Sequence, residues 1–311
     1  RRGDVVVRVN GQEVRDRAQL RAAVGQATWY LEVEVLREGR PVVLQDRRLR
    51  YDPEELGVVT APEPGVVHQS DFVGPCYGRR PLRFYSLHSV DLATGRCAVE
   101  PLLCRAGQAT IDAFWASWWR LGLPRYQQVD NESLFFGSVI HPRGLGLLIR
   151  LCLSVGVEPW FAPPGEPWRH GAVEWFNAHW RAKGPLRHPL ADEAALRAAS
   201  RAFEARHNSR YRYTKLQGKT PLGALAAWKG QLRFPPVREA PRHPLPKPDT
   251  GRYHAVRLVH SDGGFDLFGE RLRAPDVAVH EYVRVTVDVG QQQLRLYLDD
   301  ALIDEQAYRL R

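Results

Sequence analysis

The fold is decided by three neighbouring runs of sequence, VVHQSDFV at 66–73, FYSLHSVD at 84–91 and RCAVEPL at 96–102. Each run has the length of a strand and is rich in apolar, β-branched or aromatic residues, which favours a strand with at least one buried face. The segment DLATG at 91–95 carries the residues of a tight turn between the second run and the third. The three runs therefore predict consecutive strands joined by short connections.

Helices and strands alternate after this point. We expect strands at 126–129 and 157–161, and helices at 108–121, 144–155, 168–182 and 191–206. Hairpin-connected strands followed by alternating helices and strands describe an α/β fold, in which helices flank a mixed sheet. We assign residues 66–228 to this core.

The first 50 residues differ in character from the core. They contain RGDVVVRVNGQEV, RDRAQLRAAV and YLEVEVLREGRPV, and the Asn10-Gly11 pair is a strong hairpin signal. Together these runs resemble the second half of a PDZ domain, so we expect a partial PDZ-like α+β segment at 1–50, with short strands around one helix at 19–24. The loop and strand with which a whole PDZ domain grips a peptide carboxylate have no counterpart here. Residues 51–65 are rich in proline and glycine and predict a linker.

The C-terminal part begins with a cationic stretch. Residues 206–247 hold ten Lys and Arg against one acidic residue, Glu239, and the second half of this stretch is rich in proline. We therefore expect a stiff, basic linker at 229–250. Short alternating runs separated by turn residues follow at 251–311, and they predict a small antiparallel β-barrel.

The composition bounds the function. The 311 residues include 44 Lys and Arg against 35 Asp and Glu, a net charge of +9 that favours a polyanionic partner. No apolar run is long enough to span a membrane, so we expect no membrane association. The four cysteines form no C-x-x-C pair. We interpret them as reduced thiols and expect a cytoplasmic protein.

Three carboxylates occupy positions that this topology can bring together. Asp71 lies within the first strand of the core, Asp130 directly follows the strand at 126–129, and Glu174 lies one turn into a helix. Ligands of open α/β sheets gather at the carboxyl ends of strands. Phosphodiester transfer needs an activated oxygen nucleophile and a stabilised leaving oxygen, and two divalent ions held by carboxylates can serve both.

The flanking sequences sharpen this hypothesis. SDFVGP, VDNE and PWRHGAVEWFN, together with FYSLHSVDLATGRCAVE, HNSRYRY and KTPLGAL, resemble the integrase-core (DDE) transposases of bacterial insertion sequences and the retroviral integrase cores. The resemblance implies a ribonuclease-H-like fold, two Mg²⁺ or Mn²⁺ ions, and nicking and strand transfer of DNA. It also implies double-stranded DNA, as element ends and target, and a homo-oligomer on that DNA.

The resemblance also distributes roles among residues. Asp71, Asp130 and Glu174 match the metal ligands and catalytic carboxylates. Asn177 matches a polar residue that supports the site, and Arg181 matches a basic residue near DNA, so we place both with the DNA-binding residues. The basic, aromatic-rich segment after the last helix adds candidates for contact with DNA phosphates. These are Arg210, Arg212, Lys215 and Lys219, interleaved with Tyr211 and Tyr213.

Several alternatives stay open at this level. Glu166 rivals Glu174, because 35 residues lie between it and Asp130, the spacing of retroviral integrases. Asp91 is a second rival, although its DLATG setting favours a turn. Trp175 is either a packing residue or a platform for an unpaired base. No end-recognising helix-turn-helix region is visible. The alternatives to a DNA transposase are therefore a catalytically idle, DNA-binding relic and a peptide-binding fragment of a PDZ-containing protease.

Overall fold

The structure is a computed structural model. It describes residues 5–9, 12–15, 19, 31–37, 40–46, 61, 63–79, 82–164, 170–187 and 189–311. The chain divides into two compact units, Arg1–Val58 and Val59–Arg311. Each is described separately below.

The smaller unit contains a four-stranded antiparallel sheet in the order β2-β1-β3-β4. Its strands are β1 (Val5–Val9), β2 (Gln12–Glu13), β3 (Leu31–Arg37) and β4 (Arg40–Asp46). The pairing of Val9 with Gln12 agrees with the hairpin predicted at Asn10-Gly11. The helix expected near 19–24 lies outside the described residues except for Gln19. The PDZ-like character of this unit stays a prediction.

The larger unit is built on the meander that the sequence predicts. It comprises β5 (Val67–Tyr77), β6 (Arg83–Asp91) and β7 (Cys97–Leu102), paired antiparallel. Two strands then add in parallel on the other edge of β5, first β8 (Tyr126–Val129) and then β9 (Glu158–Phe161). This part is therefore a mixed sheet with β5 near its centre, as expected.

The helices of the larger unit agree broadly with the predictions. They are α2 (Gly107–Leu121), α3 (Ser133–Phe136), α4 (Leu147–Leu153), α5 (Gly171–Lys183), α6 (Glu193–Arg210) and α7 (Pro221–Ala227), with short 3-10 turns at Pro185–Arg187, Thr214–Leu216 and Asp276–Ala278. Helix α4 is shorter than predicted, because Gly146 is extended and starts the helix only at Leu147.

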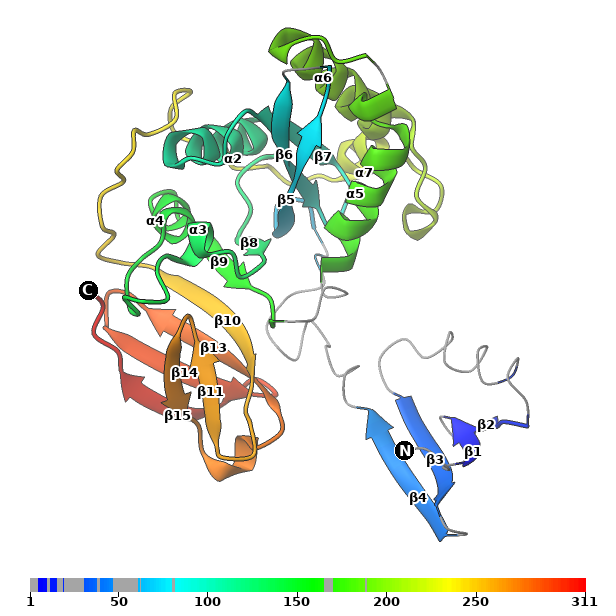
Figure 1. Cartoon of the computed structure of the whole chain (residues 1–311), viewed down its shortest axis with the longest axis vertical. Helices are drawn as coiled ribbons and strands as arrows, with labels where there is room; N and C mark the ends of the chain where they lie inside the picture. Colours follow the sequence, from blue (N-terminus) through cyan, green and yellow to red (C-terminus); the bar gives the residue numbers. More distant parts are fainter. Residues whose placement is uncertain are drawn as a thin grey trace. The chain divides into compact units, whose positions relative to one another are not determined.

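Helices cover both faces of the meander (Figure 1). Phe72 and Leu87 point to one face, where they share a core with Phe114 and Trp118 of α2. Their strand neighbours point the other way and pack against the apolar stripes of α5 and α6. That second core contains Val73, Phe84, Val90, Val99, Val173, Phe176, Trp180, Leu196 and Phe203. The period-2 alternation of the strands thus fixes which helix lies on which face.

The C-terminal strands continue the core sheet. They are β10 (Arg252–Leu258), β13 (Tyr282–Asp288), β14 (Gln293–Leu298) and β15 (Ala301–Ala307), joined antiparallel as expected, with a separate hairpin of β11 (Gly264–Leu267) and β12 (Glu270–Arg273). Strand β10 pairs in parallel with β9, so nine strands form one sheet in the order β15-β14-β13-β10-β9-β8-β5-β6-β7.

This pairing bridges the boundary expected between the core and a separate C-terminal barrel. The two parts also share apolar contacts, since Phe268 stacks on Phe136 with ring centroids 4.5 Å apart and lies 4.9 Å from the ring of Phe161. The alternation of residues 251–311 revealed the strands but not their partner, because the edge that a strand joins is not encoded locally. Closure of these strands into a barrel stays a prediction.

Within the described part of the chain, no helix has both the length and the apolar character needed to cross a membrane.

Candidate active site

Strand register places two of the predicted carboxylates at the same level. Strands β5 and β8 are parallel neighbours, and Gln69 is the partner of Gln128. The side chains of these two residues are joined by a 3.0 Å hydrogen bond from Gln69 Nε2 to Gln128 Oε1. Asp71 and Asp130 each follow two residues later. Asp71, in the middle of β5, therefore lies level with Asp130, which directly follows the end of β8.

Helix α5 brings the third carboxylate to the same place. Its first turn is attached to β5 by a hydrogen bond of 3.2 Å from the backbone nitrogen of Val173 to Gln69 Oε1. The apolar face of the helix is buried, and Glu174 lies on its exposed face. Partial burial and the negative charge of Asp71 both raise the pKa of Glu174 above its usual value.

The charge of Asp71 acts on every carboxylate around it. Burial, followed by the charges of Glu132 and Asp71, raises the pKa of Asp130 to about 7. Burial also raises the pKa of Asp71 itself, although a hydrogen bond from Asn177 and the positive charges of Arg181 and Arg105 oppose the shift. Asp71, Asp130 and Glu174 therefore form an acidic cluster. Burial and the neighbouring negative charges favour the protonated form of these carboxyl groups more than the nearby arginines oppose it.

Glu132 is a fourth member of this cluster, and the sequence analysis did not anticipate it. It forms an ion pair with Arg105 and lies two residues beyond Asp130. Burial and the charge of Asp71 raise the pKa of Glu132, while Arg105 opposes them. The guanidinium of Arg105 lies 4.9 Å from the ring centre of Phe72. The signal in the sequence was the second acid of VDNE, which we had interpreted only as the context of Asp130.

Asn177 supports Asp71 from helix α5. Its Nδ2 donates a 2.7 Å hydrogen bond to Asp71 Oδ2, and its Oδ1 accepts one of 2.6 Å from His88 Nδ1. His88 is fully buried, and burial lowers its pKa to about 3, so the ring is neutral. Only 5% of Asn177 is exposed, and both ends of its amide are used. Asn177 therefore fixes the Asp71 carboxylate from helix α5, and its part in catalysis or DNA binding stays a prediction.

The turn that carries Asp130 is fixed from the C-terminal strands. Arg257 of β10, 3% exposed, donates from Nη2 to Asn131 Oδ1 at 2.8 Å and from Nε to the carbonyl oxygen of Asp266 at 2.9 Å. Asn131 Nδ2 donates in turn to the carbonyl oxygen of Ala162 at 2.5 Å. Residues from the C-terminal part therefore hold the loop next to the acidic cluster.

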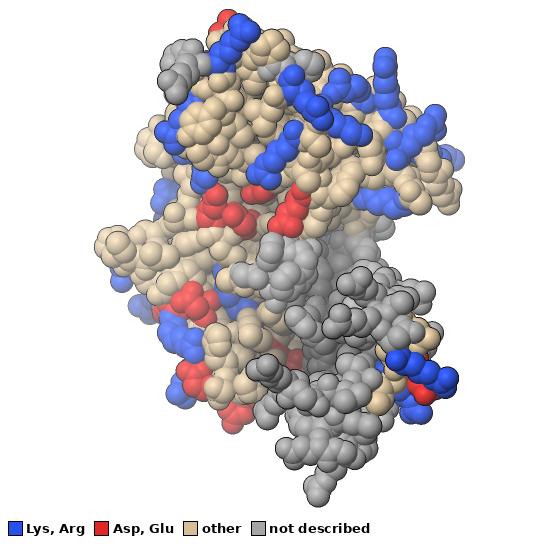
Figure 2. Space-filling model, turned by 45° about the vertical axis from the view of Figure 1, so that its right-hand side comes forward, with Lys and Arg blue, Asp and Glu red and all other residues tan. Residues whose placement is uncertain are grey.

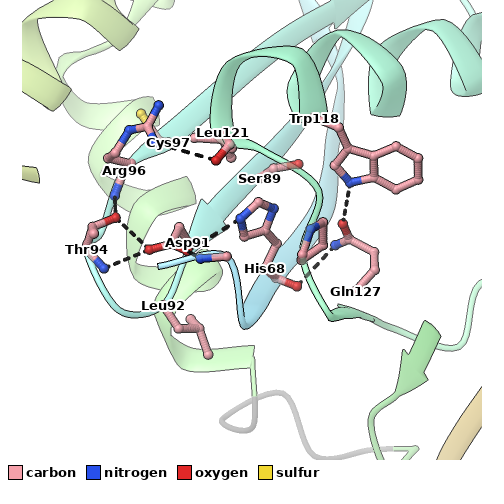
Figure 3. A network of polar contacts seen from close by, with 12 residues as sticks. His68, Ser89, Asp91, Leu92, Thr94, Arg96, Cys97, Trp118, Leu121 and Gln127 are labelled. Atoms are coloured by element: carbon pink, nitrogen blue, oxygen red, sulfur yellow. Dashed lines mark hydrogen bonds and ion pairs between the residues drawn. The ribbon is translucent and has the colours of Figure 1, made fainter. Parts of the chain in front are cut away.

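Asp91, the rival carboxylate, has a structural role (Figure 3). Its Oδ1 accepts hydrogen bonds from Thr94 N and Oγ1 at 2.8 and 2.6 Å, and its Oδ2 accepts one from Gly65 N at 2.8 Å. His68 Nε2 lies 3.4 Å from the same Oδ2. Burial raises the pKa of Asp91, but His68 and these hydrogen bonds outweigh it and hold the pKa at about 2. Glu166, the rival of Glu174, lies outside the described residues.

The predicted DNA-contacting cations lie on the surface. All five are exposed, and none forms an ion pair with a carboxylate in the part of the chain that the structure describes. They are Arg181, Arg210, Arg212, Lys215 and Lys219. Figure 2 shows a face on which acidic side chains gather beside a region with many Lys and Arg side chains. An acidic patch and a basic region therefore lie side by side on this face.

The donor set fits a hard divalent cation. Carboxylate oxygens are the ligands that Mg²⁺ and Mn²⁺ prefer, and the raised pKa values of Asp71, Asp130 and Glu174 indicate that a cation would relieve their repulsion. Among the described residues, however, no three His, Cys, Asp or Glu side chains already stand close enough to hold one ion. Binding would therefore require these side chains to rotate toward each other.

Comparisons with known proteins add the following. No protein family profile matches the sequence, and no curated protein matches it either. The HTLV-2 integrase catalytic core domain in complex with magnesium is similar in its trimeric form, at 21% identity and a TM-score of 0.39, over 51% of this chain and 95% of that chain. Its dimeric form matches at 20% identity and a TM-score of 0.38, over 52% and 97%.

A chain from a larger assembly is similar over more of this protein. It is the simian T-cell lymphotropic virus intasome in complex with PP2A regulatory subunit B56 gamma, at 16% identity and a TM-score of 0.41, over 79% of this chain and 77% of that chain. Structural similarity at TM-scores of 0.38 to 0.41 carries no argument about function. The functional proposal below therefore rests on the site itself.

Proposed function

We propose that this protein is a DNA-recombining enzyme of the integrase and transposase type, which nicks DNA and transfers strands with the help of divalent cations. The observation that carries the proposal is the approach of carboxylates from β5, the end of β8 and α5, because Gln69 of β5 is hydrogen-bonded to Gln128 of β8 and to Val173 of α5. Burial and, to a lesser degree, the charge of Asp71 raise the pKa values of both Asp130 and Glu174. The mixed sheet with flanking helices is also what a ribonuclease-H-like fold requires.

The chemistry follows from the residues of the cluster. Mg²⁺ or Mn²⁺ ions held by Asp71, Asp130 and Glu174 would supply an activated oxygen nucleophile and a stabilised leaving oxygen. Asn177 and His88 fix the orientation of the Asp71 carboxylate. The exposed cations around the cluster would bind DNA phosphates and set the position of the strand. Among them, Arg181 is a cation whose charge acts on Asp71.

Nicking of supercoiled DNA tests the proposal directly. The wild type should nick in Mg²⁺ or Mn²⁺ and not in EDTA, whereas Asp130→Asn should lose at least about a hundredfold in rate. Asp112→Asn is the matched control, because Asp112 is exposed on α2 and is hydrogen-bonded only to Gln108 among the contacts described. If the wild type nicks no faster than Asp130→Asn, the enzyme proposal fails, and a DNA-binding relic becomes the better description.

A further inference from the structure

An aromatic pocket of about 390 Å³ lies beside the first turn of α5. Gly171, Ala172 and Trp175 of the helix form one side of it. Tyr211 and Tyr213, from the segment that follows α6, form another side. The volume lies within the range of small-ligand sites. None of these residues belongs to the acidic cluster.

The rings of the pocket have faces suited to stacking. The indole of Trp175 is 41% exposed, and it packs parallel to the imidazole of His179 with ring centroids 5.3 Å apart and planes 10° apart. The rings of Tyr211 and Tyr213 lie 5.3 and 5.6 Å from that of Trp175, at steep angles. An indole that is partly exposed within a frame of packed aromatic rings keeps surface on which a further ring can stack.

The tyrosine walls are held in place before any ligand arrives. Tyr211 stacks on the buried His207 with centroids 5.2 Å apart and planes 5° apart. The hydroxyl of Tyr213 lies 3.1 Å from His207 Nε2, and its ring packs so closely on Gly95 that a Cβ there would lie 2.7 Å away. Rigid walls reduce the conformational entropy that binding would otherwise cost.

Two cations lie at the same pocket. Arg212 and Lys215 line it, and both are exposed. Their contacts are with carbonyl oxygens, from Arg212 Nη1 to Gly218 at 2.9 Å and from Lys215 Nζ to Leu92 at 3.0 Å. Neither residue forms an ion pair with a carboxylate among the described parts of the chain, although the charge of Asp91 acts on Lys215. Aromatic faces beside cations that are not ion-paired match a nucleotide, which offers a base to stack and a phosphate to pair.

The pocket also lies next to the acidic cluster. Trp175 directly follows Glu174 on α5, so the pocket and the acidic cluster occupy neighbouring faces of the same helical turn. We propose that this pocket binds an unpaired nucleobase of a DNA strand that passes through the active site. The proposal rests on the function proposed above and adds a way to hold a strand end separated from its complement. Stacking tolerates any base, so we expect little sequence preference.

Equilibrium binding in EDTA tests the pocket without requiring catalysis. The probes are a blunt duplex, the same duplex with a short unpaired 3′ tail, and a tailed duplex whose tail lacks its bases. The wild type should bind the tailed duplex about tenfold more tightly than the blunt one, the scale of one base stacked on an aromatic side chain. The abasic tail should lose this advantage, which separates stacking from phosphate charge. 2-Aminopurine in the tail should be quenched on binding.

Variants locate the effect in the pocket. Trp175→Ala should abolish the preference for the tail, and Trp175→Phe should restore most of it. Gly171→Leu should also abolish it by filling the pocket, and it should fold, because a Cβ at Gly171 meets no atom within 4 Å. Trp119→Ala, which removes another exposed tryptophan on α2, should keep the full preference.

The outcomes separate the pocket from the enzyme. A protein that nicks DNA but binds blunt, tailed and abasic probes equally keeps the proposed function and loses the pocket. A protein that prefers the tail but never nicks loses the proposed reaction and keeps the pocket. A tail preference that survives both Trp175→Ala and Gly171→Leu places the base elsewhere and overturns the inference.

Discussion

Asn177 Nδ2 donates a 2.7 Å hydrogen bond to Asp71 Oδ2, which joins helix α5 to strand β5 across 106 residues of chain. The other end of the same amide accepts from His88 Nδ1 at 2.6 Å. Because His88 is buried and neutral, the amide is held in one orientation. Asn177 therefore sets the direction of the central carboxylate.

The first prediction concerns the hydrogen bonds that join Asp71, Asn177 and His88. Asn177→Leu should cost about 1–3 kcal/mol in the free energy of unfolding, because His88 Nδ1 is left buried without a partner. It should also slow nicking about 10- to 100-fold per folded molecule, since groups that orient metal ligands have effects of this size. Thermal unfolding and nicking rates measure the two effects separately.

Asn208→Leu is the control for this variant. Asn208 is also a buried asparagine, but both ends of its amide bind the backbone of Cys97, at 2.9 Å each. It should destabilise the protein to a similar degree and leave nicking per folded molecule unchanged. Equal losses of activity in the two variants would show that Asn177 acts only through stability.

The second prediction decides between the two candidates for the third carboxylate. Glu174→Gln should reduce nicking by at least about a hundredfold, because the charge of Asp71 already reaches Glu174. Glu166→Gln should nick at close to the wild-type rate. The reverse result would transfer the metal-ligand role to Glu166 and would remove Glu174 from the site.

The third prediction concerns Arg105, the cation paired with Glu132. Without Arg105 the acidic cluster loses nearby positive charge, so Arg105→Leu should lower the melting temperature in EDTA. Added Mg²⁺ should then raise the melting temperature more than it does in the wild type, because binding to the folded state stabilises it. Arg125→Leu is the control, since Arg125 also lies over an aromatic ring, that of Tyr126. A Mg²⁺ response identical to the wild type would argue against cation binding at the cluster.

The fourth prediction is a dependence of stability on pH. Burial and, to a lesser degree, the charge of the nearby His179 lower the pKa of His207 from 6.5 to about 4, although the carbonyl of Gly95 opposes them. The ring also stacks on Tyr211, and its Nε2 lies 3.1 Å from the hydroxyl of Tyr213. Between pH 6.5 and 4 the unfolded chain binds the proton more tightly than the folded one, so stability is lost as the pH falls through this window.

His207→Gln should make this loss smaller by about 1–3 kcal/mol. Denaturant unfolding at a series of pH values measures it. His260→Gln is the control, because His260 is exposed, and the acid dependence of that variant should follow the wild type. A slope unchanged by His207→Gln would mean that His207 titrates as it does in the unfolded chain.

The sequence predicts those features of the site that depend on neighbouring residues in the chain. It does not predict contacts between residues far apart in the chain. Asp71 and Asp130 were predicted from strand position together with their flanking motifs, and the register sets the middle of β5 beside the end of β8. Glu174 needed the resemblance, because spacing from Asp130 alone favours Glu166. The contribution of His88 could not be foreseen, because its partner Asn177 lies 89 residues away.

The C-terminal part shows the same limit for the fold. Alternating residues revealed β10 and its neighbours as strands, but not that β10 pairs with β9. An unpaired strand edge must be covered by something, and the identity of the cover is a property of the whole chain. Arg257 was likewise invisible as a site residue, because it reaches Asn131 across 126 residues.

The last prediction tests whether the C-terminal strands and the core form one cooperative unit. Arg257→Leu should cost about 2–4 kcal/mol, because Asn131 Oδ1 and the carbonyl of Asp266 lose a buried charged donor. It should also slow nicking, since Asn131 adjoins Asp130. Arg284→Leu is the control within the same strands, because Arg284 contacts Tyr297 and Asp300 and not the acidic cluster. If the C-terminal strands were an independent barrel, Arg257→Leu would unfold them in a separate transition and leave nicking intact. One sheet and one shared core predict instead a single transition for the larger unit and a loss of activity with it.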